Sequence, residues 1–504
     1  MGLHDFTIYS VLKRNAIVHS QRTALIQGEE RITHKQYLER VDNVAKGLTE
    51  VGVRKGDRVA ILALNSLEYV YLYGACAKLG AILLLVNWRL NPEEIKFVIS
   101  DGSPKVVFVG KDYQKLAKTA ISGIDSIIRC FSMGPPENGF DAFGELMNND
   151  GVSSEGDVGA DDPYVIMHTA AVGGRPRGAV LSHSGLLNAN FQMVAQWNLT
   201  SYDCNISMLP LFHVTGMGCW LMISQVGGTN IILPRVEPES ALNMIQQEKV
   251  TILASFPPIL ASLLDKNREL HREVSSLRLV FGLEGPDTVK RLDEETSATF
   301  WAVFGQCETC GLVTTAPYLE RLGSAGLPCM LSDVRIVDEQ GNFAETGQTG
   351  EIVVQGPIVF SGYWNLEKET EHTFRGGWHH TGDMGRFDED GYLYYAGRMP
   401  EKELIKPGGE NVYPAEVEKV VLEHPLVEEV SVIGVPDQQW GEAIKAVCVL
   451  KQGKSLEVAE LIEFVASRIA RYKKPKHVVF VPGLPKNQDG SIDRVKVKSE
   501  HGSA

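Results

Sequence analysis

A glycine-rich loop is the first segment of this 504-residue chain whose composition suggests chemistry. The loop runs from Thr169 to Gly178, follows an apolar segment from Tyr164 to His168, and contains Gly173 and Gly174 together with two arginines. Glycines let several backbone N–H groups converge on a phosphate, and arginine adds a positive charge with a forked pair of donors. The GxxxxGK[ST] pattern of a P-loop is absent. Taken alone, the loop is as compatible with a surface turn as with an anion site.

A series of polar and glycine-rich segments follows the loop. They include a histidine beside an aromatic ring, a Phe-Gly-Gln-Cys-Glu segment, a Thr-Gly-Asp turn and a Lys-Pro-Gly-Gly-Glu turn. In chain order, the segments are Leu209–Gly216, Leu277–Pro286, Phe304–Thr309, Gly350–Val354, Gly362–Trp364, Thr381–Asp383, Gly397–Arg398, Ile405–Pro414 and Tyr472–Lys486. Together they resemble the AMP-forming acyl-CoA synthetase family, part of the adenylate-forming superfamily that also includes luciferase and peptide-synthetase adenylation domains. The resemblance extends from Thr23 to Arg494.

The resemblance implies a two-step reaction that uses ATP, Mg²⁺ and coenzyme A. A carboxylate attacks the α-phosphate of ATP and releases pyrophosphate, and the thiol of coenzyme A then displaces AMP from the acyl-adenylate. Negative charge collects at phosphorus in the first step, so cationic groups and a metal ion should converge there. The implied enzyme is an acid–thiol ligase whose substrate is a small-molecule carboxylic acid.

The resemblance also assigns residues to the nucleotide. Glu308 is expected to hold Mg²⁺, a hard cation that suits carboxylate and phosphate oxygens. Phe304 should lie against the adenine, and Asp383 should accept both ribose hydroxyls because a carboxylate has two acceptor oxygens. The full expected set, with Arg177 in a catalytic role, is Thr169, Gly173, Gly174, Arg177, Gly178, Glu284, Gly285, Pro286, Phe304, Gly305, Gln306, Cys307, Glu308, Asp383 and Arg398.

Two further groups are expected around the acid and coenzyme A. His213 should lie at the mouth of the acyl pocket in a catalytic position, with apolar walls from Phe212, Met217, Trp220 and Phe281. The pantetheine tunnel should be bordered by residues that include small ones, which allow close approach of the backbone, namely Lys406, Gly408, Gly409 and Glu410. No expected pocket position offers an arginine or lysine for a second carboxylate, which favours a monocarboxylic fatty or aryl acid.

Two departures from the family pattern affect the expected catalysis. In the loop, Ala170, Ala171 and Val172 occupy three positions of the family pattern and lack two of its hydroxyl side chains, and Gly173 replaces a third. Each lost hydroxyl contact to phosphate costs roughly 1–3 kcal/mol, and Cys307 replaces a further hydroxyl residue. Near the C-terminus, Ser491 stands where the family has the lysine that bridges the carboxylate and the α-phosphate. Loss of one such electrostatic stabiliser slows the first step by roughly 10²–10³.

Three interpretations of Ser491 are open. Lys486, Lys496 or Arg177 takes over the missing charge; or the enzyme favours the thioester half-reaction or the ATP-forming reverse direction; or the chain binds nucleotide with little catalysis. A carrier-protein-loading adenylation enzyme would share every ATP motif, although no carrier domain is fused here. Acyl-CoA formation by the wild type and by Ser491→Lys separates the three interpretations of Ser491, and coenzyme-A-dependent release of AMP with a carboxylic acid excludes a non-catalytic protein.

Alternating helical and strand patterns must hold these segments in place. Thr33 begins a capping-box pattern followed by a helical repeat, and apolar strands are expected at Val59–Leu64 and Val106–Val109. Helices and strands in alternation predict a parallel sheet covered by helices. After about residue 340, short strands among many glycines predict antiparallel structure. The polar, glycine-rich stretch Asn138–Asp162 is predicted to be a surface linker.

The fold implied by the resemblance is α/β. A large N-terminal AMP-binding domain, residues 1–397, should consist of two α/β subdomains plus a β-barrel, and residues 398–504 should form a small mobile α+β C-terminal domain. The hinge should lie near Arg398, although the segment Met399–Glu403 is longer than usual and does not show which residue pivots.

Composition excludes other classes. The chain has 49 Lys+Arg and 63 Asp+Glu, a formal net charge of −14, which argues against nucleic-acid binding. No stretch approaches the roughly 20 apolar residues of a membrane-spanning helix. The eight irregularly spaced cysteines predict reduced thiols in a cytoplasmic enzyme, and the lone Cys307–Cys310 pair is a weak candidate for zinc or redox chemistry. The oligomeric state is not readable, and a homodimer is left open.

Overall fold

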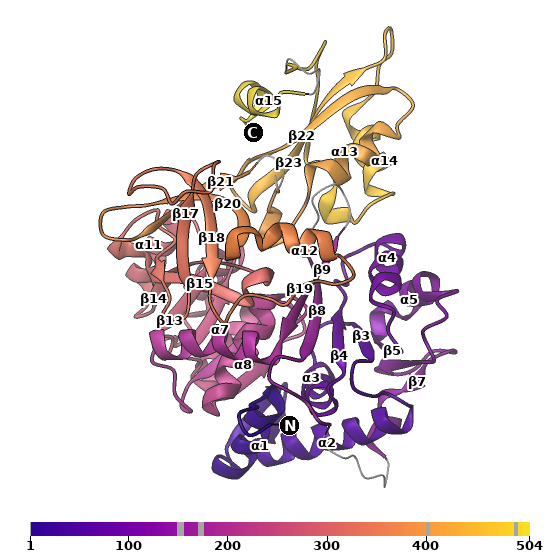
Figure 1. Cartoon of the computed structure of the whole chain (residues 1–504), viewed down its shortest axis with the longest axis vertical. Coiled ribbons are helices and arrows are strands. Elements are labelled where there is room, and N and C mark those ends of the chain that lie inside the picture. Colours follow the sequence, from indigo (N-terminus) through magenta and orange to yellow (C-terminus); the bar gives the residue numbers. More distant parts are fainter. Residues whose placement is uncertain (1, 149–155, 170–175, 400–403, 488–491, 504) are drawn as a thin grey trace.

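Two stacked sheets form the large N-terminal part of the computed structural model (Figure 1), which describes residues 2–148, 156–169, 176–399, 404–487 and 492–503. The first sheet has the order β19-β9-β8-β4-β3-β5-β6-β7. Its strands are β3 Arg58–Leu62, β4 Ile82–Leu85, β5 Val106–Gly110, β6 Arg129–Met133, β7 Asp141–Ala142, β8 Pro163–Thr169, β9 Arg177–Ser182 and β19 Gly362–Tyr363. Strands β8 and β9 pair antiparallel with Thr169 opposite Arg177, so both ends of the glycine-rich loop are fixed to this sheet.

The second sheet has the order β16-β15-β14-β13-β12-β10-β11-β1-β2. Its strands are β1 Thr23–Gln27, β2 Glu30–Thr33, β10 Cys204–Ser207, β11 Thr229–Ile232, β12 Ile252–Ser255, β13 Leu279–Gly282, β14 Thr299–Gln306, β15 Gly311–Pro317 and β16 Leu327–Pro328. The central strands are parallel, as predicted for this fold class. Strand β14 leads directly into the 3₁₀ turn Cys307–Thr309, which presents Glu308.

Helices fill the space between the sheets and cover their outer faces. One continuous core joins both sheets through α1 Ile8–Val18, α2 His34–Glu50, α3 Leu67–Leu79, α7 His183–Gln196 and α8 Val214–Val226. The outer face of the first sheet packs against α4 Pro92–Gly102 and α5 Gln114–Ile121. The outer face of the second sheet packs against α9 Pro238–Glu248, α10 Ile259–Leu270 and α11 Pro286–Glu295. Strands buried on both faces account for the near-continuous apolar runs in the sequence.

The third unit is an antiparallel sheet with the order β17-β18-β20-β21. Its strands are β17 Asp333–Val337, β18 Gly350–Gln355, β20 His379–Phe387 and β21 Leu393–Arg398, and α12 Glu367–Thr373 lies in the connection before β20. The predicted antiparallel pairing is confirmed. The described residues show no ladder between the first strand, β17, and the last strand, β21. The backbone of Leu393 in β21 instead exchanges hydrogen bonds with Ala325 and Gly326, just before β16 of the second sheet.

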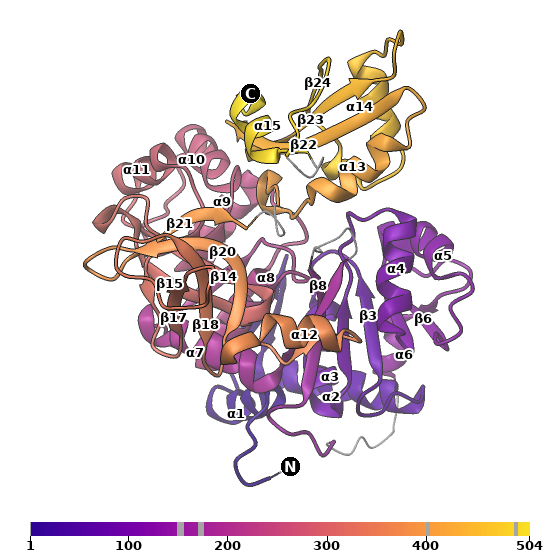
Figure 2. The same ribbon diagram turned by 45° about the horizontal axis from the view of Figure 1, so that its top comes forward.

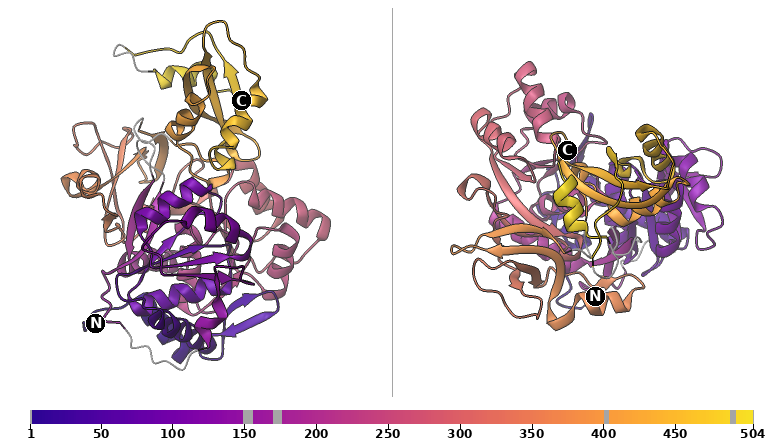
Figure 3. Two further views of the ribbon diagram at one scale, coloured as in Figure 1. Left: turned by 90° about the vertical axis from the view of Figure 1, so that its right-hand side faces the viewer. Right: turned by 90° about the horizontal axis from the view of Figure 1, so that it is seen from above.

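The C-terminal part has its own sheet and hydrophobic core. The sheet comprises β22 Val427–Asp437, β23 Gly441–Leu450 and β24 His477–Phe480, with helices α13 Pro414–Leu422, α14 Val458–Ala466 and α15 Arg494–His501. In Figure 2 and in the left view of Figure 3 this part, coloured orange to yellow, lies at one end of the molecule above the sheets of the N-terminal part. The fold prediction of a large α/β N-terminal part and a smaller α+β C-terminal part is confirmed.

The structure also tests several predictions about individual segments. The capping box at Thr33 is present at the start of α2. The linker prediction is partly wrong, because Phe143–Met147 forms helix α6 with a buried Leu146 side chain. Helix α6 contacts α2 at Gly47, where a Cβ atom would come within 2.6 Å of the Leu146 carbonyl oxygen, so the glycine makes room for the helix.

All eight cysteines lie within the described residues and are free thiols. Among those residues, none of the helices has the length and apolar content that a membrane span requires.

Candidate active site

A cleft of about 1080 Å³ lies where the N-terminal sheets, the antiparallel sheet and the C-terminal part meet. Most of the predicted site residues line it although they come from segments far apart in the chain. Those residues are Thr169, Arg177, His213, Glu284, Phe304, Gly305, Gln306, Cys307, Glu308, Asp383, Arg398, Lys406, Gly408, Gly409 and Glu410. The fold therefore brings the motifs recognised in the sequence to one cavity.

Some predicted residues lie elsewhere. Gly178 is inside β9, where a Cβ atom would come within 2.8 Å of the Ile166 side chain, so its small size serves packing in the sheet. Gly285 and Pro286 begin α11 and are not among the residues that line the cleft. The prediction of Phe212, Met217 and Trp220 as pocket walls is wrong, because all three are buried in the core between the sheets. Gly173, Gly174 and Ser491 lie outside the described residues.

One end of the cleft is built around Glu308. Its Oε1 accepts hydrogen bonds from the Thr169 hydroxyl at 3.2 Å and from the Tyr363 hydroxyl at 3.0 Å. The Arg177 guanidinium lies 4.2 Å from the centroid of the Tyr363 ring. Both hydrogen bonds end on Oε1, so within the part of the chain that the structure describes Oε2 receives none. This end therefore combines an oriented carboxylate with a cation.

These residues fit a magnesium ion. Mg²⁺ in nucleotide sites takes one or two carboxylates and completes its shell with substrate phosphates and water. Glu308, with one oxygen fixed and the other without a hydrogen bond, supplies such a carboxylate at the cleft. No group of three or more acidic, histidine or cysteine side chains suited to a metal occurs among the described residues, so an all-protein metal cage is not present there.

The other end of the cleft is built around Asp383. This side chain is 1% exposed and lies on β20 directly opposite Arg398 on β21, whose Nε is 3.0 Å from its Oδ1. The Tyr395 hydroxyl donates to the same oxygen at 3.2 Å, and the Gln306 amide donates to Oδ2. The Phe304 and Tyr395 rings, with centroids 6.3 Å apart, add aromatic faces beside this carboxylate. A buried acceptor next to aromatic rings suits a nucleoside.

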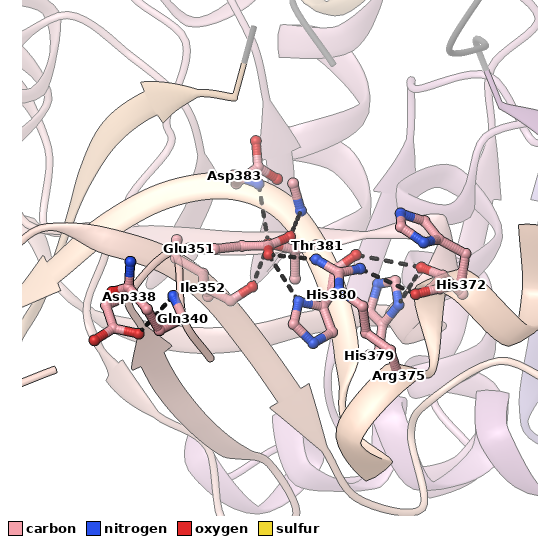
Figure 4. A network of polar contacts seen from close by, with 12 residues as sticks. Asp338, Gln340, Glu351, Ile352, His372, Arg375, His379, His380, Thr381 and Asp383 are labelled. Carbon is pink, nitrogen blue, oxygen red and sulfur yellow. Dashed lines mark hydrogen bonds and ion pairs between the residues drawn. The ribbon is translucent and has the colours of Figure 1, made fainter. Parts of the chain in front are cut away.

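A second carboxylate, Glu351 on β18, holds the part of β20 that precedes Asp383 (Figure 4). Its Oε1 accepts from the Gly382 N–H at 2.9 Å, and its Oε2 accepts from His380 Nδ1 at 2.7 Å and Arg375 Nη2 at 2.9 Å. Burial raises the pKa of Glu351, but the hydrogen bonds and positive charge around it outweigh burial, and its pKa lies below the ordinary value. Asp383 and the residue before it are thereby held in place within the antiparallel sheet.

Replacing Glu351 with Gln keeps the shape but removes the charge that faces Arg375 and His380. A hydrogen bond to a charged group contributes about 1.5–3 kcal/mol, so the unfolding free energy at neutral pH should fall by about that amount. Because the pKa in the folded state is depressed from 4.5, the contribution is fully present above pH 4.5 and is lost as pH falls through the folded value. Urea denaturation of both proteins from neutral pH downward measures the difference. A difference that grows below pH 4.5 would contradict the assignment, and Asp390→Asn, in an exposed pair with Arg321, serves as a control with little effect.

The C-terminal part contributes a glycine turn to the cleft. Gly408 and Gly409 form the 3₁₀ turn Pro407–Gly409 with positive φ angles of 59° and 85°, and a Cβ on Gly408 would come within 2.8 Å of the Trp440 ring. The next residue, Glu410, lies 2.8 Å from Arg89 Nη1 and 3.3 Å from His213 Nε2. This ion cluster holds the turn against the N-terminal part.

Burial shifts several pKa values along the cleft. Burial raises the pKa of Glu410, but His213, Arg89 and the amide of Asn87 outweigh it and lower that pKa to about 2. Burial, with the nearby Arg398, lowers the pKa of Lys406 to about 8. Burial raises the pKa of the Glu284 carboxyl to about 7, opposed by the hydrogen bond from Ser255.

Burial also raises the pKa of the Cys307 thiol, with the charge of Glu308 adding to the effect. Cys307 therefore stays protonated, and a protonated thiol is a weak hydrogen-bond donor. Its position in the cleft beside Glu308 is the one at which the sequence departs from a hydroxyl residue.

Several residues of this site were not predicted individually. Tyr363 lies in the Gly362–Trp364 segment, and that segment was the available signal for it. Tyr395, Arg89 and Asn87 reach the site through the fold, and nothing in their local sequence distinguishes them from surface residues.

Comparison with known proteins gives consistent matches over nearly the whole chain. Residues 12–364 match the family described as AMP-binding enzyme, and residues 416–491 match the AMP-binding enzyme C-terminal domain. The indoleacetate–CoA ligase of Aromatoleum aromaticum is 32% identical over 495 residues, which cover 97% of this chain and 96% of that protein.

Two solved structures of one enzyme, the o-succinylbenzoate CoA synthetase of Bacillus subtilis, are also similar. A double mutant bound with its product analogue OSB-NCoA superposes with a TM-score of 0.87 at 29% identity over 98% of each chain. The complex with the acyl-adenylate intermediate OSB-AMP superposes with a TM-score of 0.72 at 30% identity, over 98% of this chain and 99% of that one. The arrangement of the present chain is thus closer to the product-analogue complex.

Proposed function

Because this chain belongs to the AMP-binding enzyme family and is an AMP-forming acid–thiol ligase, we propose that it activates a monocarboxylic acid of the aryl or fatty class and transfers the acyl group to coenzyme A. The family and the enzyme class predicted from the sequence motifs are confirmed by these matches. The observation that carries the proposal is that motif residues from six or more separate segments line one cleft.

In the first half-reaction, the carboxylate oxygen of the acid forms a bond to the α-phosphorus of ATP, and the bond from that phosphorus to pyrophosphate breaks. We assign Asp383 to the ribose hydroxyls and Phe304 to the adenine, because the carboxylate is buried and flanked by rings. Arg177 and Thr169 bind the phosphate chain, next to Glu308. A magnesium ion at Glu308 would neutralise phosphate charge when bound.

In the second half-reaction, the thiol of coenzyme A attacks the acyl carbon and AMP leaves. The Gly408–Gly409 turn, which lacks side chains, borders a path for the thin pantetheine chain into the cleft. His213 lies at this entrance, held by Glu410. The closer likeness to the product-analogue complex supports an arrangement suited to this step.

We place the boundary between the domains at Arg398, the last residue of β21. In this proposal residues 1–397 and residues 398–504 change their relative orientation between the half-reactions. The cluster of Glu410, Arg89 and His213 would then stabilise the thioester arrangement and separate during adenylation.

A panel of carboxylic acids tests the function. With ATP and Mg²⁺, we expect at least one aryl or fatty monocarboxylate to give AMP release that rises on addition of coenzyme A, with equal amounts of thioester. The same acids without coenzyme A are the control. Supplying the acyl-CoA with AMP and pyrophosphate and measuring ATP reports the reverse direction. Formation of thioester without AMP would refute the assignment, and so would AMP release that does not change on addition of coenzyme A for any of the acids.

A further inference from the structure

A buried lysine outside the cleft joins the two parts of the molecule. Lys473 lies in the 3₁₀ turn Arg471–Lys473 of the C-terminal part, and its side chain is 6% exposed. Its Nζ donates to Glu94 Oε1 at 2.5 Å and to Glu416 Oε2 at 2.7 Å. Glu94 lies on helix α4 of the N-terminal part, and Glu416 lies on helix α13 of the C-terminal part. Lys473 therefore binds one carboxylate from each part.

Each carboxylate is held by the first turn of its own helix. Glu94 is the third residue of α4, and its Oε2 accepts from the N–H of Asn91, the residue that caps the helix, at 2.9 Å. Glu416 is the third residue of α13, and its Oε1 accepts from the N–H of Tyr413 at 2.9 Å. In both cases the second oxygen is the one that binds Lys473. Lys473 thus meets two carboxylates whose orientations are fixed independently of it.

The two carboxylates keep Lys473 charged. Burial lowers the pKa of Lys473, but the charges of Glu416 and Glu94 outweigh burial and hold its pKa above the ordinary value. Removing one partner of a buried ion pair leaves an uncompensated charge, so a buried pair has a much larger effect than an exposed one. The contact with Glu94 should therefore favour the relative orientation of the two parts in which it forms.

A neighbouring contact joins the same two surfaces. The Asn91 side-chain amide donates to the carbonyl oxygen of Arg468 at 2.9 Å, so the residue that caps α4 also binds the C-terminal part. In Figure 2, helices α13 and α14 lie over the end of α4. Helix α4 is packed against the first sheet. The C-terminal part is thus fixed to a well-packed element of the N-terminal part.

The start of α13 connects Lys473 to the cleft. Tyr413, whose N–H is bound by Glu416, lines the cleft, and so do residues 408–410 just before it in the same segment. Neither Lys473 nor its two carboxylates are among the described residues that line the cleft. Lys473 therefore acts on the cleft by holding this segment in position and touches no substrate there.

We propose that Lys473 is a positioning residue for the second half-reaction. By binding Glu94 in the arrangement seen here, it holds the C-terminal part where the glycine turn and Glu410 border the cleft. When the C-terminal part turns for adenylation, Lys473 keeps Glu416 and separates from Glu94. This inference rests on the proposed function, because it requires two half-reactions with different orientations of the C-terminal part.

Glu94→Gln tests the contact from its N-terminal side. Gln keeps the size and an oxygen that can accept from the Asn91 N–H, but removes the charge that faces Lys473. We expect thioester formation from coenzyme A and supplied acyl-adenylate to slow about 10-fold, through kcat, and ATP–pyrophosphate exchange to stay within about 2-fold or to rise. The acyl-adenylate is that of the acid with the highest rate in the panel above. A variant that was merely less well folded would lose both rates together.

Substitutions of Lys473 test the other side of the contact. Lys473→Met removes the charge and should slow thioester formation at least as much as Glu94→Gln does, whereas Lys473→Arg keeps the charge and should retain more of the rate. The double variant Glu94→Gln/Lys473→Met should be no slower than Lys473→Met alone, because both changes remove the same contact.

Glu93→Gln is the matched control, since Glu93 is an exposed acid in the same turn of α4. It should leave both half-reactions within about 2-fold of the wild type. Thermal unfolding of every variant confirms that each is folded.

Three results would overturn the inference. They are wild-type rates of both half-reactions in Glu94→Gln, a loss of exchange as large as the loss of thioester formation, and additive losses in the double variant. A wild-type enzyme that catalyses neither exchange nor thioester formation with any acid gives a separate result, because it refutes the proposed function and the positioning role with it.

Discussion

Glu308→Gln is expected to slow acyl-adenylate formation by about 10²–10³-fold, the loss typical when one electrostatic stabiliser of a transition state is removed. The substitution keeps the size of the side chain, and Oε1 can still accept from Thr169 and Tyr363. It removes the negative charge and puts an NH₂ group where a second carboxylate oxygen lies. An amide is a poor ligand for a hard divalent cation compared with a carboxylate. The effect should therefore appear in the phosphate chemistry more than in folding.

Pyrophosphate release, measured over a range of Mg²⁺ concentrations, reports this step. The variant should need more Mg²⁺ for half-maximal rate and should not recover fully at saturation. Thioester formation from acyl-adenylate supplied directly should change much less, because no pyrophosphate is formed in that step. Glu320→Gln, an exposed acid in the 3₁₀ turn Tyr318–Glu320, is the control. Equal losses in both half-reactions would contradict a role confined to the phosphates.

The sequence predicted the helices and strands that position the cleft residues better than it predicted how side chains pack around the cleft. The apolar run Val106–Val109 and the capping box at Thr33 are local features, and they formed the expected strand, β5, and the expected helix, α2. Their local signal is strong because a parallel strand is buried on both faces and a capping box satisfies its own backbone donors. The antiparallel sheet after residue 340 was recognised for a similar reason, since its short strands are separated by glycine turns.

Helix α8 shows why the acyl pocket was predicted incorrectly. The helix lies between two sheets, so it is buried on nearly all sides, and its apolar residues show no single face in the sequence. Met217 and Trp220 face the core, whereas Gly218, Cys219 and Met222 line a small cavity of about 50 Å³ beside the main cleft. Helical periodicity distinguishes buried from exposed faces and gives no information when both faces are buried.

The residues that orient the site depend on strand register. Glu351 reaches Gly382 because β18 and β20 pair with Glu351 opposite Met384, and Asp383 meets Arg398 because β20 and β21 place them opposite each other. A shift of one residue in either pairing would turn these side chains to the other face of the sheet. Sequence motifs identified Asp383 and Arg398 but not their partners, since register is a property of the assembled sheet.

Ser491→Lys is expected to accelerate acyl-adenylate formation by about 10²-fold or more, the converse of losing one electrostatic stabiliser. Ser491 lies outside the described residues, and the expectation rests on the charge that the family pattern places there. The structure shows where the three residues that could replace this charge lie relative to the cleft. Lys486 pairs with Glu429 in the C-terminal part, and neither Lys486 nor Lys496 lines the cleft in this arrangement. Arg177 does line it, but belongs to the phosphate end.

The measurement separates the two half-reactions, since a lysine delivered to the α-phosphate should act on the first one alone. ATP–pyrophosphate exchange should rise in Ser491→Lys, while thioester formation from supplied acyl-adenylate should stay within about 2-fold of the wild type. Lys486→Ala in the wild-type background provides the complementary test, because a lysine that already replaces the missing charge would make this variant lose exchange activity. If Ser491→Lys gains nothing and Lys486→Ala loses most of the exchange, Lys486 supplies the charge, and the C-terminal part must then break the Lys486–Glu429 pair whenever it turns for adenylation.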